Sequence, residues 1–465
     1  MPASVTSRTA LWISLALSCL AVLSPVRAGK ILADRPAMDD ARPPASAPAR
    51  HRVLFIATSN VPKGKFRNLE MIAADAGIAI EARYLPQIPA DADASIYAGF
   101  DAVFVDSYLR DQVKAHLAKS LPGLRVPSAW LYDKQPEWSG GMDEATARTL
   151  IDYYSNGGER NFRGFFALLA AKLDGRPTPR ALPPPQIFPE TAAYHPRLPG
   201  LISGDPQAYL RWAGASADKP VIAVLIHQQY IAAMQTGFID DLIARIEARG
   251  ATPLVLYSPA MQGGTLAPWL RPDRQQPARA DVLINTQIML DAEGRRGEFG
   301  DIGIPVIQAM PYRKGDTEAW RADPQGVALM DVPFYFAQSE YAGVFDIQVA
   351  SSTRGSDDAI VAIPEQLDAV VGKAIHLAAL RRKPNADKRL ALMFWNYPSG
   401  EKNLSASFMN VPRSLQGTLD GLRAAGYAVP ETPPEAWLIE RLQRLLAPTY
   451  REGLLDALID DGLAA

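Results

Sequence analysis

The sequence has few of the residues that bind metals or form disulfides. It contains one cysteine, Cys19, and five histidines among 465 residues. No two histidines stand four residues apart or form a His-x-His pair. Because a metal site gathers several histidine, cysteine or carboxylate ligands, this spacing predicts surface or packing roles for most of the histidines. Only His227, at the end of a predicted strand, is a weak candidate ligand at this stage.

The motifs of several enzyme classes are also missing. No G-x-x-x-x-G-K-[ST] sequence is present, so ATP hydrolysis is not an intrinsic activity. The chain also lacks a G-x-S-x-G nucleophile motif, an H-E-x-x-H motif and a G-x-G-x-x-G motif after a strand. The 48 lysines and arginines balance the 50 aspartates and glutamates, which argues against a nucleic-acid partner.

Residues 1–28 have the pattern of a secretory signal peptide. Arg8 precedes the apolar stretch 10–23, and Val26-Arg27-Ala28 offers a cleavage site. We therefore expect export, with the periplasm as the destination and no stable membrane span after cleavage. An uncleaved N-terminal anchor is the alternative. The Pro/Ala-rich residues 29–50 predict a flexible linker.

After residue 51 the chain alternates between predicted strands and helices. Predicted strands at 53–57, 78–84, 102–106 and 126–132, with a helix near 112–121, indicate a doubly wound parallel sheet. The same order returns at 221–226, 253–257, 281–285 and 305–309, with a helix at 237–249. The predicted fold class is therefore α/β, with consecutive doubly wound, flavodoxin/Rossmann-like parallel-sheet domains. The expected organisation is a first α/β domain ending in a helical segment (51–175), a Pro-rich linker (176–218), a second α/β domain (219–385) and an incomplete third (386–465).

The start of the third domain carries the most informative segment. The apolar run 390–395 predicts a buried strand, and the turn Asn396-Tyr397-Pro398-Ser399-Gly400 follows it. Apolar residues at helical spacing from Val411 onward predict a helix that ends near Gly426. In open α/β sheets such a strand–loop–helix order places the loop at the ligand-binding edge.

This segment, FWNYPSGEKNLSASFMNVPRSLQGTLDGLRAAGY, resembles HNYPPGEANIG…LDVPESL…LLKALKEAGY of the large subunit of class I tetrapyrrole metal chelatases. The family comprises the cobaltochelatase N subunit and the magnesium chelatase H subunit. YYSNGGERNFRGFFALL at 153–169 is similar to the family's Y-x-x-GG-x-x-N segment, and Tyr194-His195-Pro196 to its YHP pattern. PVIQA at 305–309 resembles the family's PVLQA.

The sequence departs from the family at several places. The Gly before YHP is missing, Ala342 replaces an acidic residue, and His227-Gln228-Gln229 stands where the family usually has Arg and His. The family's GTHG…E…PGK segment has no counterpart, so we expect the sequence to cover about the N-terminal third of a large subunit and not to be catalytic alone. The periplasmic location also differs from that of the best-known members.

The resemblance implies a corrin- or porphyrin-binding chain that acts in metal insertion or removal, with cobalt or magnesium as the metal substrate. It implies no intrinsic cofactor, and ATP would be used by AAA+ and integrin-domain-like partner subunits. His195 becomes a second weak candidate for a metal ligand. Two alternatives stay open: a periplasmic small-molecule-binding module and a non-catalytic scaffold. The candidate ligand-binding residues are Asn396, Tyr397, Gly400, Glu401, Lys402, Asn403, His195, Tyr154 and Asn161.

Overall fold

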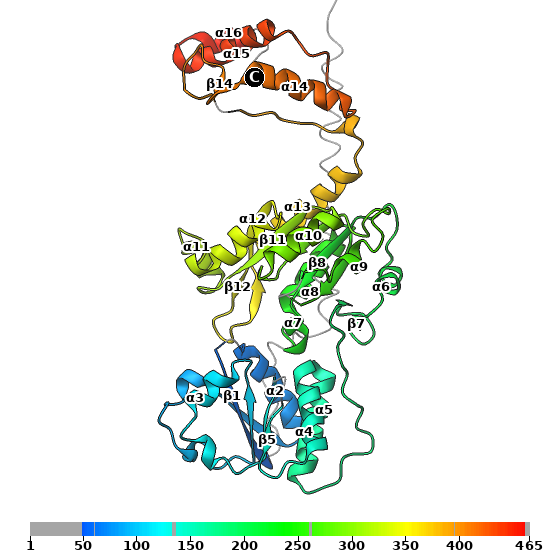
Figure 1. The fold of residues 1–465 in the computed structure, drawn as a ribbon, viewed down its shortest axis with the longest axis vertical. Helices are drawn as coiled ribbons and strands as arrows, with labels where there is room; N and C mark the ends of the chain where they lie inside the picture. The colour runs from blue at the N-terminus through cyan, green and yellow to red at the C-terminus, as the bar shows by residue number, and fades with distance from the viewer. Residues whose placement is uncertain (1–48, 60, 133–135, 260–262, 395, 461–465) are drawn as a thin grey trace, which may run out of the picture. The chain divides into compact units, whose positions relative to one another are not determined.

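The computed structural model describes residues 49–460 except 60, 133–135, 260–262 and 395. The predicted signal peptide and nearly all of the N-terminal linker lie outside the described residues. The chain divides into two compact units, Met1–Ile375 and His376–Ala465 (Figure 1). Within the described residues, we find no helix with the length and apolar character needed to cross a membrane.

The first unit contains two sheets, and the first of these forms an α/β region between residues 51 and 173. Its strands are β1 (His51–Ala57), β2 (Ile78–Tyr84), β3 (Ala102–Asp106), β4 (Ser128–Trp130) and β5 (Trp138–Ser139). The strand order is β2-β1-β3-β4-β5, with only β5 antiparallel. This is the order of flavodoxin-like doubly wound sheets. The predicted bounds of β2 and β3 are confirmed, whereas β4 is shorter than the run 126–132 because it pairs with β3 over three residues.

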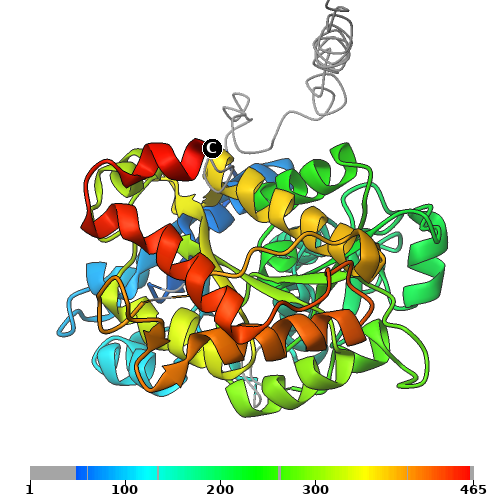
Figure 2. The same cartoon turned by 90° about the horizontal axis from the view of Figure 1, so that it is seen from above.

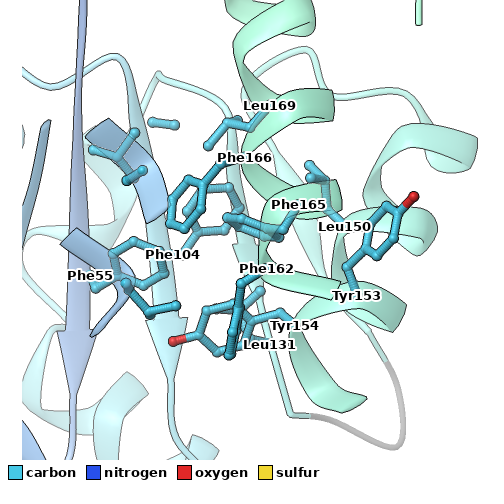
Figure 3. Close-up of a cluster of buried hydrophobic side chains, with 14 of the residues drawn as sticks. Phe55, Phe104, Leu131, Leu150, Tyr153, Tyr154, Phe162, Phe165, Phe166 and Leu169 are labelled. Carbon is cyan, nitrogen blue, oxygen red and sulfur yellow. The ribbon is translucent and has the colours of Figure 1, made fainter. Parts of the chain in front are cut away.

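Helices cover both faces of this sheet, which explains why the inner strands β1 and β3 are largely apolar and buried, whereas the edge strand β2 includes Glu81 and Arg83. The helices are α2 (Lys63–Asp75), α3 (Arg110–His116), α4 (Glu144–Asn156) and α5 (Glu159–Leu173). Phe55 of β1 packs with α2, α4 and α5, whereas its neighbour Leu54 packs with α3 on the opposite face. In Figure 3 the rings of Phe55 and Phe104 face Phe165 of α5, with ring centroids 5.1 Å apart for Phe104 and Phe165. Burial of each such ring stabilises the fold by about 1.5–3 kcal/mol.

The second α/β region of the first unit is built on an eight-stranded sheet. The strands are β6 (Ala192–Tyr194), β7 (Ile202–Ser203), β8 (Val221–Ile226), β9 (Thr252–Tyr257), β10 (Val282–Asn285), β11 (Val306–Tyr312), β12 (Asp346–Thr353) and β13 (Ile360–Ala362). Their order is β13-β12-β11-β10-β8-β9-β6-β7. The central strands β9, β8, β10, β11 and β12 are parallel, and each strand beyond them pairs antiparallel with its inner neighbour. The predicted fold class is confirmed in both regions.

The linker between the two regions is shorter than the predicted 176–218. Residues 174–191 contain no helix or strand, but β6 pairs with β9 through Tyr194 and Val255. Residues 192–212 therefore belong to the second region, because β6 and β7 satisfy their backbone groups at the edge of its sheet. They include α6 (Pro206–Trp212).

Helices pack on both sides of the second sheet. They are α7 (Gln229–Ala232), α8 (Gly237–Ala248), α9 (Ala267–Leu270), α10 (Ala292–Ile302), α11 (Thr317–Ala322), α12 (Gln338–Tyr341) and α13 (Pro364–Arg382). Ala223 and Leu225 of β8 pack with α9 and α10. Ile222 and Val224, on the opposite face of the same strand, are also fully buried, and α8 contacts the neighbouring β9. The last helix, α13, begins in the first unit and ends in the second.

The second unit does not contain the predicted strand 390–395. Residues 390–394 form no strand, Leu390, Leu392, Met393 and Phe394 are exposed, and Trp395 lies outside the described residues. The reason is physical: a parallel strand needs a neighbour for its backbone hydrogen bonds, and the described part of this unit offers none there.

The rest of the second unit is a small hairpin with helices. The elements are β14 (Ser405–Ala406), β15 (Met409–Asn410), α14 (Val411–Ala424), α15 (Glu435–Tyr450) and α16 (Leu454–Asp460). Asn410 caps α14 by accepting a hydrogen bond from the Arg413 amide, and Gly426 has a φ of 83° just beyond its end. The α14 helix contacts α15, and Figure 2 draws the two in orange and red.

Candidate functional site

The polar loop 396–403 is held in shape by its own side chains. Its Tyr397–Pro398 peptide bond is cis. Asn396 Nδ2 donates to the Gly400 carbonyl (3.2 Å), and Asn403 Nδ2 donates to the Pro398 carbonyl (3.2 Å). A Cβ at Gly400 would lie 2.7 Å from Asn403 Nδ2, so a side chain at this position would displace the Asn403 amide. Both asparagine side chains therefore donate hydrogen bonds that stabilise the loop conformation.

The same loop is attached to the end of α15. The Gly400 amide donates to the Tyr450 hydroxyl (2.8 Å), and Arg451 Nε donates to Glu401 Oε2 (2.9 Å). Glu401 is thus paired, whereas the ring of Tyr397 is 58% exposed. Because the loop is braced from two sides, its exposed side chains are presented from a defined backbone.

A groove of 360 Å³ lies between this loop, the β14–β15 hairpin and α15. Lys402 lines it, together with Leu404, Phe408 and Met409 from the hairpin segment and Ile439 from α15. Phe408, at the hairpin turn, is fully exposed.

The two ionic groups of the groove differ in their surroundings. Glu435 accepts from Asn410 Nδ2 (3.2 Å) and pairs with Arg413 (3.4 Å). Lys402 has no carboxylate partner among the described residues. The groove therefore combines apolar side chains with polar ones, Ser405, Ser407, Asn410 and Gln443, and with one available cation. A partly apolar ligand that carries a carboxylate suits this lining.

A second polar cluster lies in the first unit, at the carboxyl end of β3. Lys65 Nζ donates to Asp106 Oδ2 (2.8 Å) and to the Tyr132 hydroxyl (3.0 Å), and Tyr154 donates to the same Asp106 oxygen (2.8 Å). The Lys65 and Asp106 side chains are 3% and 1% exposed. Burial, followed by the nearby Asp106 carboxylate, raises the pKa of Tyr154 well above its usual value, which keeps its hydroxyl a donor.

This cluster adjoins the point where the two α/β regions meet. The ring of Tyr108 packs against that of Tyr132 at a tilt of 31°, with ring centroids 4.6 Å apart, and its hydroxyl accepts from Gln229 of the second region at 2.5 Å. Gln229 follows the carboxyl end of β8, so the carboxyl ends of β3 and β8 meet here; we call this place the inter-sheet junction. His227, directly after β8, keeps access to solvent, but the surrounding protein desolvates its imidazole and lowers its pKa.

The two weak candidates for metal ligands are far apart in the fold. His195 follows β6, which runs antiparallel to β9 and ends near the amino end of that strand. Its ring is 1% exposed, accepts from the Arg197 amide at Nδ1 and lies 3.3 Å from Glu247 at Nε2; burial lowers its pKa. His227 lies at the opposite, carboxyl edge, so the two cannot bind one ion. The described residues contain no group of three or more His, Cys, Asp or Glu side chains arranged for a metal.

The other candidates from the Gly-Gly segment have partners within the fold. Asn161 is buried and makes two hydrogen bonds with the backbone of Gln186 in the linker, at 2.8 and 2.9 Å. The Gly158 amide donates to the Ala232 carbonyl of α7 (2.9 Å). A Cβ at Gly157 would lie 2.2 Å from that oxygen. The Gly-Gly-x-x-Asn sequence therefore fixes the linker and the second region against α5.

The six loop candidates lie together in the second unit, whereas Tyr154, Asn161 and His195 belong to the first unit. Their roles in ligand binding stay predictions. Sequence reasoning did not single out Lys65–Asp106 or Tyr108–Gln229. The available signal was the position of Asp106 and Tyr108 at a strand's carboxyl end, where ligands of α/β proteins bind.

The fold and these sites define an α/β protein with tandem flavodoxin-like sheets and a helical C-terminal unit. Residues 151–455 match the family description CobN/Magnesium Chelatase, and the chain belongs to that family. The resemblance seen in the sequence is thereby confirmed.

Two curated relatives illustrate the similarity. The aerobic cobaltochelatase subunit CobN of Pseudomonas aeruginosa is 28% identical over 314 residues, covering 64% of this chain and 24% of that protein. The magnesium-chelatase H subunit of Rhodobacter capsulatus is 24% identical over 349 residues, covering 68% of this chain and 27% of that protein. The chain spans about a quarter of the length of these relatives.

A solved structure agrees in fold. The catalytic subunit of cobaltochelatase from Mycobacterium tuberculosis superimposes with a TM-score of 0.60 at 22% identity, over 88% of this chain and 33% of that one. The likeness supports the tandem α/β architecture.

Proposed function

We propose that this chain is the tetrapyrrole-binding, N-terminal part of a metal chelatase large subunit, acting in the insertion of cobalt or magnesium into a corrin or porphyrin, or in its removal. Membership of the CobN/magnesium chelatase family supports a chelatase role. The observation that carries the finer proposal is the groove beside loop 396–403. The family match includes this loop and this groove.

The chemistry of the groove fits such a ligand. A tetrapyrrole offers a flat apolar ring and peripheral carboxylates. The exposed ring of Phe408, with Leu404 and Ile439, supplies apolar contact area, and Lys402 supplies a cation for a carboxylate. Asn396, Gly400, Glu401 and Asn403 would act by holding the loop, and Tyr397 by contact.

The remaining parts of the reaction are assigned to other components. The metal ion is a substrate, and no resident cofactor is proposed. ATP would be hydrolysed by AAA+ and integrin-domain-like partner subunits, because the chain has no phosphate-binding loop of its own. Binding, not turnover, is therefore the activity to test on this chain.

The test is a titration of the purified chain with a metal-free porphyrin and with a corrin that carries free carboxylates, followed by Soret absorbance and tryptophan quenching. Saturable binding is expected. Phe408→Ala should weaken it by roughly 5–30-fold, from the lost apolar contact. Lys402→Ala should weaken it by about 2–5-fold, because an exposed ion pair contributes little.

Lys383→Ala is the matched control, since it removes an exposed cation of the second unit outside the groove. Tyr397→Ala and Asn403→Ala test the loop. Equal affinity of wild type and groove variants would refute the groove as the site. No binding at all by a folded chain would favour a scaffold role.

The inter-sheet junction favours a second candidate function. Two α/β regions whose strand ends meet can close on a small ligand, as in periplasmic binding proteins. Binding lost in Tyr108→Ala but kept in Phe408→Ala would favour this candidate.

Export to the periplasm is part of either proposal, and N-terminal sequencing of the protein from fractionated cells tests it.

A further inference from the structure

One loop of the second α/β region is attached to a helix of the first. The loop, residues 354–358, connects β12 to β13, and it contacts the first turn of α2. The Gly64 amide donates to the Asp357 carbonyl (2.8 Å), and Lys63 Nζ lies 3.0 Å from Asp358 Oδ2. Arg67 lies 3.3 Å from Asp357 Oδ2. One backbone hydrogen bond and two ion pairs therefore join elements almost three hundred positions apart in the sequence.

The loop is organised before it meets α2. Arg354 binds Asp357 through two hydrogen bonds of 2.8 and 2.6 Å, and the Ala359 amide donates to the same carboxylate at 3.2 Å. Asp357 is 2% exposed, and Asp358 has a left-handed φ of 58°. The short loop thus holds a carboxylate and a carbonyl in place for the other region.

This arrangement keeps the free-energy cost of separating the loop from α2 low. If α2 moves away, Asp357 keeps Arg354 and the Ala359 amide, so no buried charge loses all its partners. Lys63 and Asp358 are 56% and 42% exposed, and both can be hydrated. Water can replace the hydrogen bonds and ion pairs that are broken when the loop separates from α2. Such contacts are expected to form and break reversibly.

Other contacts between the two regions differ in kind. Gln229 to Tyr108, Asn68 to the Met234 carbonyl (3.1 Å), and Gly158 to the Ala232 carbonyl are hydrogen bonds without an ionic partner. The contact of Gly157 and Gly158 with Ala232 is too close for a Cβ. Screening by salt therefore acts on the loop 354–358 contact and much less on these hydrogen bonds.

We propose that residues 354–358 form an ionic latch that holds the two α/β regions of the first unit together, and that release of Lys63 and Arg67 from this latch opens the inter-sheet junction. The latch gives the junction a closed and an open state whose balance depends on two ion pairs, one exposed and one with a buried carboxylate. A ligand that enters between Tyr108 and His227 would need the open state to gain access.

The test is hydrogen exchange, measured by mass spectrometry on the full chain. In Lys63→Ala/Arg67→Ala, peptides that cover residues 62–68 and 354–359 should exchange about fivefold faster than in wild type. Peptides that cover 221–226 should be unchanged. Arg163→Ala is the matched control, because it breaks an ion pair with Asp75 at the other end of the same helix (2.8 Å).

A covalent lock gives a second readout. In a Cys19→Ser background, Lys63→Cys/Asp358→Cys joined by a short bismaleimide should suppress the faster exchange that 1 M NaCl produces in the uncrosslinked chain. Unchanged exchange in folded Lys63→Ala/Arg67→Ala would overturn the latch. So would an equal increase in Arg163→Ala, or exchange in the locked chain that still rises with salt.

Discussion

The buried Lys65–Asp106 pair yields the sharpest prediction for stability. Both side chains are almost fully buried, and Tyr132 and Tyr154 complete their hydrogen bonds. In Lys65→Met the Asp106 carboxylate keeps the Tyr154 hydroxyl but loses its counter-charge. In Asp106→Asn the ammonium keeps the Tyr132 hydroxyl and the face of the Tyr154 ring, 4.3 Å away. Breaking such a pair costs about 3–5 kcal/mol, because one charge stays buried without a partner.

The double variant Lys65→Met/Asp106→Asn removes both charges together. It should recover about 2–3 kcal/mol of the summed losses, which is a coupling energy for groups in direct contact. Hydrogen exchange of β3 gives the local free energy of opening, and a loss of about 3 kcal/mol corresponds to roughly a hundredfold faster exchange. Single variants that each lose less than about 1 kcal/mol, or a coupling near zero, would mean that water already solvates this pair, and the reasoning would fail.

Two further predictions concern contacts between the α/β regions. Gly157→Ala should destabilise the first unit by about 2–3 kcal/mol in urea unfolding, since its Cβ would lie 2.2 Å from the Ala232 oxygen at a φ of 65°. Gly175→Ala, with a similar φ of 64° but open space around the Cβ, should lose only about 1 kcal/mol, and equal losses would contradict the close-contact argument. The latch should weaken in acid. Burial raises the pKa of Asp357, but Arg354, the Ala359 amide and Arg67 outweigh this effect and hold the pKa below its usual value. A lowered pKa stabilises the folded contact above about pH 4 and loses that effect as the pH falls through the folded value. The groups that face Asp357 across the contact are Arg354, Arg67, Lys63 and Asp358. Energy transfer between dyes at Lys119→Cys and Gln275→Cys (Cys19→Ser background) should therefore decrease when the pH is lowered below about 4.

The central strands of the parallel sheets were predictable because they are buried on both faces, which requires a continuous apolar run. The run 221–226 is apolar at every position, which suits a central strand covered on both faces, and all six residues are buried. The runs 78–84 and 102–106 also match their strands end to end. At 221–226 and 102–106 the mostly apolar pattern agrees with complete burial, whereas 78–84 forms an edge strand that is mostly half-buried.

Pairings between distant residues were not predictable in the same way. Lys65 and Asp106 are 41 positions apart, and each by itself reads as a polar residue near a strand end. Tyr108 and Gln229 are 121 positions apart and belong to different sheets. The prediction of a strand at 390–395 was wrong for the converse reason. Its pattern is that of a buried strand, but the described second unit has no strand beside it. A pattern specifies burial, whereas pairing depends on what the rest of the fold supplies.

The family-like segments divide by what their side chains do in the structure. Gly157, Asn161, His195 and Gln308 are engaged inside the first unit: Gln308 is fully buried and bonds Asn285 (2.7 Å) and the Gln287 carbonyl. These segments take part in building the fold, and roles of Asn161 and His195 in ligand binding stay predictions. Loop 396–403 differs, because its amides hold the backbone while an aromatic ring and a lysine stay open to solvent beside a groove. The backbone of this loop is fixed, but the side chains of Tyr397 and Lys402 make few contacts within the protein. Recognition of a ligand best explains such an arrangement. Substitutions in the first group should therefore change stability, and those at Lys402 and Phe408 should change affinity while leaving stability nearly unaltered.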